Sequence, residues 1–516
     1  METRSSKRKK LLNAENEAQP STDLTVVADW ISDLPDAILH HILFLLPIKS
    51  IAQTSVLSKR WRHLWSSFPD LDFTTINPFG NSLTNLDSIS HKSFHSNGMD
   101  FINRVLSLRN KNKNSDIRIL RFRAHLSFSC LNGLIRRAVR QNVQELDVQV
   151  ATDDYFNLPR CIIMSDSLRV FKLKSHYPGF RLPPSSIMTG GFRSLHTLSL
   201  SLIILYNQPS LLDLFTDSSF PLLKKLNLDA CFGLENLDVS CRALQDFTLE
   251  NCFQLHGLDI SGAKLERLRV ASCFDAYSDK SWVKVNAPSL RIIIWEYNSI
   301  TENSFLENLS SLHEASIGFF VLHEDISAAK LWSVSSLLAG LSHAHCLALE
   351  SQSIEILSSN NYFAVPLSPF NSLKSLELNT GFNKSDIPGI ACLFRSSPGL
   401  HTLTLRIIND YKIERKQWNR DLWEMSNSEE EQYWESQTRA LKSFLHHLKV
   451  VKIHGFLECE NEISLVKFLL KHGRALQEMT LCSGHCNSRD SLRRQKIRSQ
   501  IMGFSRASSN AKIAFH

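Results

Sequence analysis

The sequence lacks the short motifs that mark most enzyme sites. It has no glycine-rich phosphate-binding loop, no His-Glu-x-x-His zinc motif and no Gly-x-Ser-x-Gly nucleophile elbow. Its 20 histidines are dispersed along the chain, so each is expected to be a core or surface residue. These absences predict a protein that is not an enzyme and that requires no cofactor.

The chain also has no Cys-x-x-Cys pair, and its 11 cysteines are mostly scattered singly. The longest apolar run, residues 37–48, contains two histidines and is far below the roughly 20 residues that span a bilayer. The N-terminus is polar and basic with no apolar run behind it, so no signal peptide is expected. Together these features predict a protein of the nucleus and/or cytoplasm with reduced thiols and no membrane partner.

Positive charge is scarce outside the two ends. Residues 1–10 carry +4 and residues 489–512 carry +6, so the rest of a chain of net charge +7 carries −3. This distribution argues against a nucleic-acid-binding protein. Residues 1–28 are expected to be a disordered basic tail, in which residues 7–10 are either a nuclear localisation signal or a solvated cluster.

The most informative segment is residues 29–75. Apolar residues recur at three- and four-residue spacing from Ile38 onward, which predicts a helix that ends at Pro47. A second short helix is expected to include Val56, and a third to start near Ser58. About 45 residues in three short helices bury little apolar surface, so such a module needs a partner or a neighbouring domain.

Within this segment, Leu34-Pro-Asp36 and Leu57-Ser-Lys-Arg-Trp-Arg62 resemble the F-box in its plant-type form. The resemblance implies a three-helix module that docks on the adaptor subunit of SCF-type cullin–RING ubiquitin ligases. It implies adaptor contacts at Leu34, Pro35, Ile38, Leu39, Ile42, Leu46, Pro47, Val56 and Trp61. Up to half of these residues are alternatively core residues of the module, because one sequence does not separate its two faces.

A template of the form apolar-x-x-apolar-x-apolar recurs across residues 116–481. Most copies are spaced 20–29 residues apart, which is the period of a leucine-rich repeat. A single coil cannot bury its apolar face, and stacked coils form one continuous core. Residues 116–407 are therefore expected to form a leucine-rich-repeat solenoid. The anchors, taken as the fourth residue of each template, are Leu120, Leu146, Phe171, Leu198, Leu226, Phe247, Leu268, Ile293, Ala315, Leu347, Leu376, Leu403, Val451 and Met479.

The x positions of the template are expected to face the concave side of the solenoid, because side chains alternate along a strand. Three columns follow from the alignment of neighbouring copies, and they mix charges of both signs, so they do not point to a strongly charged ligand. The alternative is a sheet face that is merely solvated. The columns are Lys225, Asp246 and Arg267; Asn227, Thr248 and Arg269; and Asp229, Glu250 and Ala271, and all but Ala271 are candidate substrate-binding residues.

Cys231, Cys252 and Cys273 lie 21 residues apart, each just after a predicted strand. Their place resembles the ladder position of leucine-rich repeats, where a small polar or thiol side chain lies inside the turn. Metal binding or a disulfide is the alternative. Residues 234–239 and 255–260 repeat the apolar pattern out of phase and are expected to be short strands on the convex side.

Residues 408–445 interrupt the repeats. We expect a long acidic and aromatic loop, which either binds a ligand or folds over the solenoid. It contains Trp418, Trp423, Glu429-Glu-Glu431, Tyr433 and Trp434.

Residues 446–516 resemble the FBD region that ends many plant F-box proteins with leucine-rich repeats. The order strand, helix, strand, helix is legible in the sequence, and such a unit suits the closing of the last coil of a solenoid. Cys482 and Cys486 with His485 are not a standard complete zinc set, so no metal is expected.

The resemblance implies an α/β fold: a small N-terminal three-helix F-box, then a curved leucine-rich-repeat solenoid with a C-terminal α/β cap. It implies a substrate-recognition subunit. Such a subunit binds an adaptor, which connects it to a cullin, and it binds an unidentified protein substrate. Two alternatives remain. One is a small-molecule co-receptor with a pocket closed by a long loop such as residues 408–445, and the other is a scaffold without a ligase role.

Overall fold

The computed structural model describes residues 31, 33–75, 101–107, 109, 116–151, 156–176, 180–181, 190–203, 215–275, 280–321, 328–358, 367–408, 429–483 and 491–516. The expected tail, residues 1–28, lies outside them. So do the first part of the expected loop, residues 409–428, and the pair His485 and Cys486. The chain forms two compact units, Met1–Phe68 and Pro69–His516.

The first unit contains three short helices, α2 (Asp36–Phe44), α3 (Ile48–Thr54) and α4 (Lys59–Ser67). Prolines precede α2 and α3 at the N-cap position, where the chain is still extended. The side chain of Ser58 caps α4 by accepting a hydrogen bond from the backbone N–H of Trp61 at 3.3 Å. The second helix ends earlier than expected, at Thr54, so Val56 lies in the turn between α3 and α4 and not in a helix.

A small apolar core holds these helices together. Leu39 and Leu43 of α2, Ile51 of α3 and Leu64 of α4 are at most 2% exposed. Phe68, which follows α4, is also buried. Burial of an aliphatic side chain contributes about 1.5–3 kcal/mol relative to exposure, so few such residues give only a marginally stable module.

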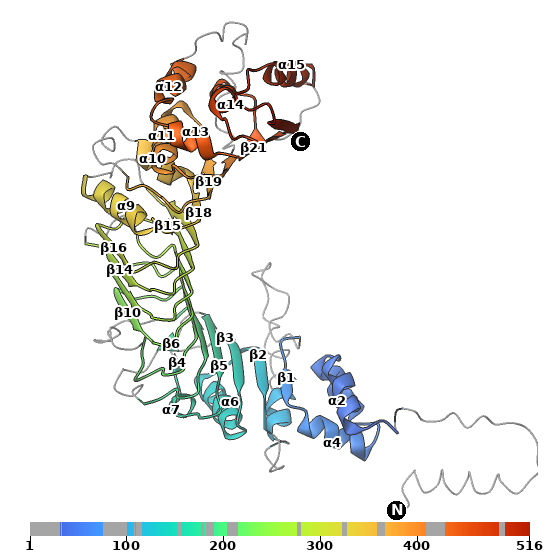
Figure 1. Ribbon diagram of the computed structural model, residues 1–516. Coiled ribbons are helices and arrows are strands. Elements are labelled where there is room, and N and C mark those ends of the chain that lie inside the picture. Colours follow the sequence, from blue (N-terminus) through green and yellow to red (C-terminus); the bar gives the residue numbers. More distant parts are fainter. Residues whose placement is uncertain are drawn as a thin grey trace, which may run out of the picture. The chain divides into compact units, whose positions relative to one another are not determined.

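The second unit is built on one parallel sheet, which has sixteen strands in the described part of the chain. Figure 1 shows that the sheet curves and that the other elements lie on its convex side. In order across the sheet, the strands are β1 (Asp70–Asp72), β2 (Ile119–His125), β3 (Glu145–Ala151), β5 (Val170–His176), β7 (Thr197–Ser201), β9 (Lys225–Asp229), β11 (Asp246–Glu250), β13 (Arg267–Ala271), β15 (Ile292–Asn298), β17 (Glu314–Phe319), β18 (Cys346–Leu349), β19 (Ser375–Thr380), β20 (Thr402–Ile407), β21 (Val450–Phe456), β22 (Glu478–Ser483) and β23 (Lys512–Phe515).

All fourteen predicted anchors lie side by side in this sheet. The strand register pairs Leu120 with Leu146, and the same alignment continues through every anchor to Met479. No anchor is more than 3% exposed. The repeat and its fold class are therefore confirmed. The sequence template missed β1 at one edge and β23 at the other.

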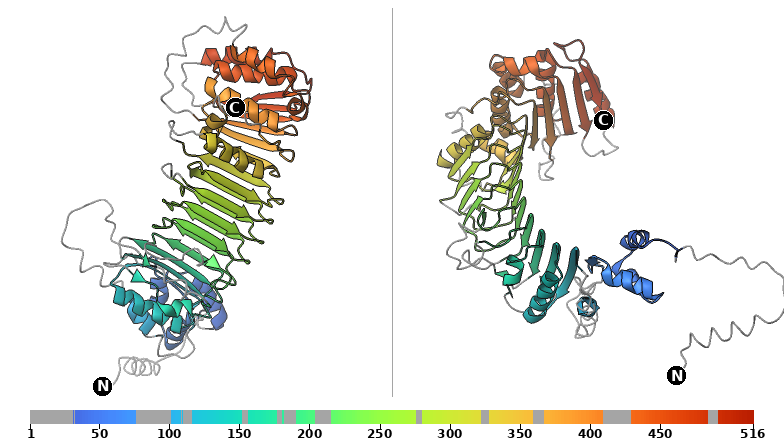
Figure 2. Two further views of the ribbon diagram at one scale, coloured as in Figure 1. Left: turned by 90° about the vertical axis from the view of Figure 1, so that its left-hand side faces the viewer. Right: turned by 60° about the horizontal axis from the view of Figure 1, so that its bottom comes forward.

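The convex layer changes along the solenoid, as the two views in Figure 2 show. In the middle it is a parallel sheet of five strands in the described part of the chain, and two of these strands are those expected from the out-of-phase pattern. They are β8 (Phe215–Thr216), β10 (Asn236–Ser240), β12 (Gly257–Ser261), β14 (Trp282–Asn286) and β16 (Asn303–Glu307). A further short pair is β4 (Phe156–Asn157) and β6 (Phe180–Arg181). The helices nearer the ends are α6 (Phe128–Arg140), α7 (Arg160–Ile163), α9 (Ala328–Gly340), α10 (Ser351–Ser358), the 3₁₀ helix η4 (Lys384–Asp386) and α11 (Ile387–Ser396).

The C-terminal region follows the expected order of strand and helix. Between β21 and β22 lies α14 (Glu460–His472), and between β22 and β23 lies α15 (Ser491–Met502). A long loop was expected to extend to residue 445. Its second half is instead helical, with α12 (Glu429–Gln437) and α13 (Lys442–His447), so this part of the prediction is wrong.

Candidate functional site

The first unit exposes a large share of its apolar side chains. Val56 is 82% exposed and Ile38 48% exposed, and Ile42, Leu46, Pro35 and Pro47 are exposed as well. Leu34 and Trp61 are half-buried. Leu39 is completely buried among the module's own helices, so its assignment to the adaptor-binding surface is withdrawn.

Sequence reasoning also missed exposed apolar residues in the same unit. Leu45 at the end of α2 is 77% exposed, and Leu57 beside Val56 is 69% exposed. Ile31 and Phe44 are exposed too. Leu45 is not among the residues whose three- and four-residue spacing predicted the first helix, and Leu57 lies in a turn. We call Ile38, Ile42, Leu45, Leu46, Val56 and Leu57 the apolar surface of the first unit.

An arginine fixes the start of α2 against α4. The Arg60 Nη2 atom lies 2.6 Å from Asp36 Oδ1, and Arg60 also donates a hydrogen bond to the backbone carbonyl of Leu34. Both contacts fall in the Leu-Pro-Asp segment that carried the resemblance. Arg60 therefore orients the loop that presents Leu34 and Pro35.

The second candidate surface is the concave sheet of the second unit. The register pairs Asp246 with Lys225 and with Arg267, and the other two predicted columns align in the same way. The alignment is therefore confirmed, and a role in binding stays a prediction. Most of these side chains are half-buried, and Ala271 is buried.

These polar side chains pair with one another across the strands. Asp246 accepts from both neighbours, with Lys225 Nζ at 3.2 Å and Arg267 Nε at 2.6 Å. The ion pair with Asp246 raises the pKa of Arg267. Asn227 donates to Ser199 Oγ at 3.4 Å.

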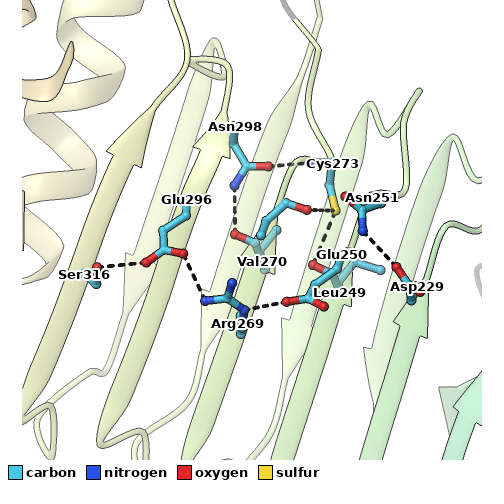
Figure 3. Close-up of polar contacts among 11 residues, drawn as sticks. Asp229, Leu249, Glu250, Asn251, Arg269, Val270, Cys273, Glu296, Asn298 and Ser316 are labelled. Carbon is cyan, nitrogen blue, oxygen red and sulfur yellow. Dashed lines mark hydrogen bonds and ion pairs between the residues drawn. The ribbon is translucent and has the colours of Figure 1, made fainter. Parts of the chain in front are cut away.

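A second network lies nearer the carboxyl ends of the strands (Figure 3). The Arg269 guanidinium bridges two carboxylates, with Nε 2.5 Å from Glu250 Oε1 and Nη1 3.0 Å from Glu296 Oε2. Asp229 accepts from Ser201 Oγ at 2.6 Å and from Asn251 Nδ2 at 2.9 Å. Much of the charge predicted for substrate recognition is thus already compensated within the sheet.

The three ladder cysteines have a structural place. Cys231, Cys252 and Cys273 are at most 1% exposed. Each follows a residue with a positive φ, such as Asn251 at 54°, which turns the chain out of the strand. The Cys273 thiol donates to the carbonyl oxygens of Leu249 and Ala271 at 3.4 and 3.2 Å. Burial raises the pKa of Cys273, which keeps this thiol protonated.

The next coil places an asparagine at the same ladder position, which the sequence reasoning missed. Asn298 Oδ1 accepts from the backbone N–H groups of Cys273 and Phe274, at 2.8 and 3.3 Å. Its Nδ2 atom donates to the carbonyl oxygen of Val270 at 2.9 Å. The signal that could have found it is the distance of 25 residues from Cys273, which is one repeat period.

The aromatic and acidic residues of α12 do not form an exposed binding surface. Trp434 is completely buried and stacks on Phe394 and Phe468, with ring centroids 6.1 and 5.6 Å away. Glu431 pairs with Lys467 at 2.6 Å, so α12 is attached to α14. The expected loop conformation is wrong for this helix, and its packing on Phe394 and Phe468 agrees with the alternative that the segment folds over the solenoid, whereas ligand binding stays a prediction. Trp418 and Trp423 lie outside the described residues.

The part of the chain that the structure describes contains no group of three or more His, Cys, Asp or Glu side chains suited to hold a metal ion. None of its helices has both the length and the apolar character needed to cross a bilayer.

Comparison with known proteins completes the description. Three family models match the chain: "F-box domain" over residues 31–72, "At1g61320/AtMIF1, LRR domain" over residues 109–275, and "FBD" over residues 437–481. A protein of Arabidopsis thaliana named as an F-box/FBD/LRR-repeat protein is 52% identical over 518 residues, which cover all of both chains. An F-box/LRR-repeat protein of the same plant is 27% identical over 465 residues, or 88% of each chain. Another is 26% identical over 420 residues, or 73% of this chain and 93% of the relative.

Proposed function

The chain belongs to the family of F-box proteins with leucine-rich repeats and an FBD region, and from this premise we propose that it is a substrate-recognition subunit of an SCF-type cullin–RING ubiquitin ligase. The first unit docks on the adaptor subunit and connects the chain through it to the cullin. The concave face of the solenoid holds a target protein. Both roles are those implied by the family.

The observation that carries the proposal is the apolar surface of the first unit. The core of this unit uses Leu39, Leu43, Ile51 and Leu64, so the exposed apolar side chains are additional to those that fold it. A folded module gains nothing from exposing side chains such as Val56 to water. Ile38, Ile42, Leu45 and Leu46 recur at three- and four-residue spacing along α2 and the two residues that follow it, and apolar exposure along one helix face supports a protein-interaction site.

The adaptor-binding residues of this proposal are those that the structure leaves accessible: Leu34, Pro35, Ile38, Ile42, Leu45, Leu46, Pro47, Val56, Leu57 and Trp61. Interfaces of this type concentrate their energy in a few apolar residues near the centre.

The concave face supports the second half of the proposal through its shape and its polar character. A curved sheet with a half-buried polar network offers many donors and acceptors in fixed positions, as the bridge from Arg269 to Glu250 and Glu296 illustrates. Because these groups are already paired, recognition by them depends on hydrogen-bond geometry more than on net charge. Target residues are expected to contact Lys225, Asn227, Asp229, Asp246, Thr248, Glu250, Arg267 and Arg269.

In this role the chain itself makes and breaks no covalent bonds. It binds a target and holds it near the ligase, so that ubiquitin transfer becomes effectively intramolecular. Positioning of two reactants can supply a large part of a rate enhancement. The nucleus and/or cytoplasm is the location proposed for this activity. The small-molecule alternative needs a closing loop, and residues 409–428 lie outside the described residues.

The proposal is tested by reconstitution with a purified adaptor. The wild-type chain is compared with Val56→Glu/Leu57→Glu, which places two charges in the most exposed part of the apolar surface. The matched control is Phe305→Glu/Phe320→Glu, which charges two half-exposed apolar residues of the second unit. Circular dichroism establishes that all three chains are folded.

We expect the wild type and the control to retain the adaptor, and the Val56→Glu/Leu57→Glu chain to bind at least about tenfold more weakly. Failure of a folded wild type to bind any adaptor would overturn the ligase role. Equal binding by all three chains would place the contact on another surface.

A further inference from the structure

One residue position in each coil has no part in the function proposed so far. It is the residue directly before each strand of the long sheet. In the six successive coils from β15 to β21, every one of these residues carries a basic or imidazole side chain. They are Arg291, His313, His345, Lys374, His401 and Lys449, which we call the basic ridge.

Backbone hydrogen bonds hold these six residues in a single file. The carbonyl oxygen of Arg291 accepts from the N–H groups of His313 and Glu314, both at 2.9 Å. The carbonyl oxygen of His345 accepts in the same way from Lys374 and the residue after it, at 2.8 and 3.0 Å. The pattern repeats at every step to Lys449. Each ridge residue therefore lies directly beside the next one.

The side chains of the ridge face water. Five of the six residues are exposed, and His401 is half-buried. The rings of His313 and His345 lie 5.1 Å apart. Among the residues that the structure describes, no carboxylate forms an ion pair with a ridge side chain. Arg267 and Arg269 of the same sheet differ, because each is paired with a carboxylate.

The ridge side chains act on one another electrostatically. The pKa of His401 is lowered, first by partial burial and then by the positive charges of Lys449 and Lys374. Three carboxylates lie close in the register: Glu266, one coil before Arg291; Glu314, directly after His313; and Glu478, whose N–H donates to the carbonyl oxygen of Lys449. The permanent positive charges of the ridge are Arg291, Lys374 and Lys449, and none of them forms an ion pair among the residues that the structure describes.

We propose that the basic ridge binds an extended acidic segment of a partner protein. Strands in a sheet lie about 4.8 Å apart, so six of them present a line about 24 Å long, which about seven extended residues would span. The line is short and carries three permanent cations, Arg291, Lys374 and Lys449, which suits a short acidic peptide better than a long polyanion such as a nucleic acid. An acidic peptide is attracted by the local charge of the ridge alone. This inference rests on the proposed function in one respect: the partner protein that carries the acidic segment is taken to be the target of the ligase.

The probe for this inference is a fluorescent peptide of eight glutamates, and its binding to the full chain is measured by fluorescence anisotropy at low and at physiological salt. The test variant is Lys374→Glu/Lys449→Glu. The matched control is Lys174→Glu/Lys284→Glu, which makes the same change of charge at exposed positions outside the ridge. Adaptor binding is measured on the same samples. A chain that binds the peptide but not the adaptor would contradict the ligase role and leave the basic ridge standing.

We expect the wild type and the control to bind the peptide equally, and the ridge variant to bind at least about tenfold more weakly. Higher salt is expected to weaken binding, because exposed charges are screened. Equal binding by both variants would overturn the inference. Tighter binding of a single-stranded oligonucleotide that displaces the peptide would overturn the choice of partner.

Discussion

Arg60 on α4 donates a hydrogen bond from Nε to Asp36 Oδ1 at the start of α2, at a distance of 2.8 Å. The same side chain reaches the carbonyl oxygen of Leu34. The Leu34-Pro35 segment is thus held by a contact from another helix and not only by its own packing.

We predict that Arg60→Ala loosens α2 without unfolding the second unit. The ion pair is largely exposed, so the loss is expected to be about 1 kcal/mol, most of it from the hydrogen bond to Leu34. Hydrogen exchange of the α2 amides in the full chain measures this, with Arg62→Ala on the exposed side of α4 as the control. Identical exchange in the two variants would show that Arg60 does not position this segment.

Asn298 is expected to be the costliest polar residue to remove from the solenoid. Asn298→Ala leaves the N–H groups of Cys273 and Phe274 and the carbonyl of Val270 without their buried partner. We expect a loss of about 2–4 kcal/mol in the free energy of unfolding, measured by urea denaturation. Asn303→Ala, at an exposed position of β16, is the control, and a similar loss there would contradict the ladder role.

Trp434 is predicted to attach α12 to the body of the second unit. Trp434→Ala removes a completely buried indole and is expected to cost about 3–5 kcal/mol. Trp434→Phe keeps most of the stacking on Phe468 and is expected to cost less than about 1.5 kcal/mol, because the indole Nε1 has no hydrogen-bond partner in the described structure. Denaturation of the three chains measures both effects. Equal losses in both variants would contradict the view that ring stacking, which phenylalanine retains, supplies most of the contribution of Trp434.

The stability of the C-terminal region is predicted to fall as the pH rises. Burial raises the pKa of the Glu462 carboxyl from 4.5 to about 8, although it accepts hydrogen bonds from the backbone N–H groups of Leu457 and Glu458. The folded chain therefore holds a proton that the unfolded chain releases between these two values. Stability is expected to decrease by about 5 kcal/mol across this window, since each pKa unit is worth about 1.4 kcal/mol.

The check is a series of denaturation curves between pH 4.5 and pH 8 for the wild type and Glu462→Gln. The wild type is expected to lose stability relative to Glu462→Gln as the pH rises. Glu478→Gln, at an exposed position of β22, is expected to follow the wild type. Parallel curves for all three chains would contradict the assignment to Glu462.

The solenoid could be predicted from the sequence because two periods reinforce each other there. Alternation within a strand and recurrence at one coil length together predicted all fourteen anchors. The first unit offered only one period. Helical spacing puts Ile38 and Leu39 on one broad stripe, and only the packing of the folded module decides that Leu39 is core and Ile38 is surface.

Other features depend on contacts that no local pattern encodes. The helix α12 is short and acidic, and it is held by Trp434 and by pairs such as Glu431 with Lys467. The net charge of the body of the chain did not indicate the basic ridge, because the body is slightly acidic as a whole. Only the strand register shows that residues as distant in sequence as Arg291 and Lys449 belong to one line.

The central claim is tested most directly by isothermal titration of the purified adaptor into the full chain at several temperatures. We expect one-to-one binding with a negative change in heat capacity, because apolar side chains such as Leu45, Val56 and Leu57 leave water on binding. We also expect that Val56→Glu/Leu57→Glu abolishes or strongly weakens this binding. The absence of binding by a folded wild-type chain would contradict the account.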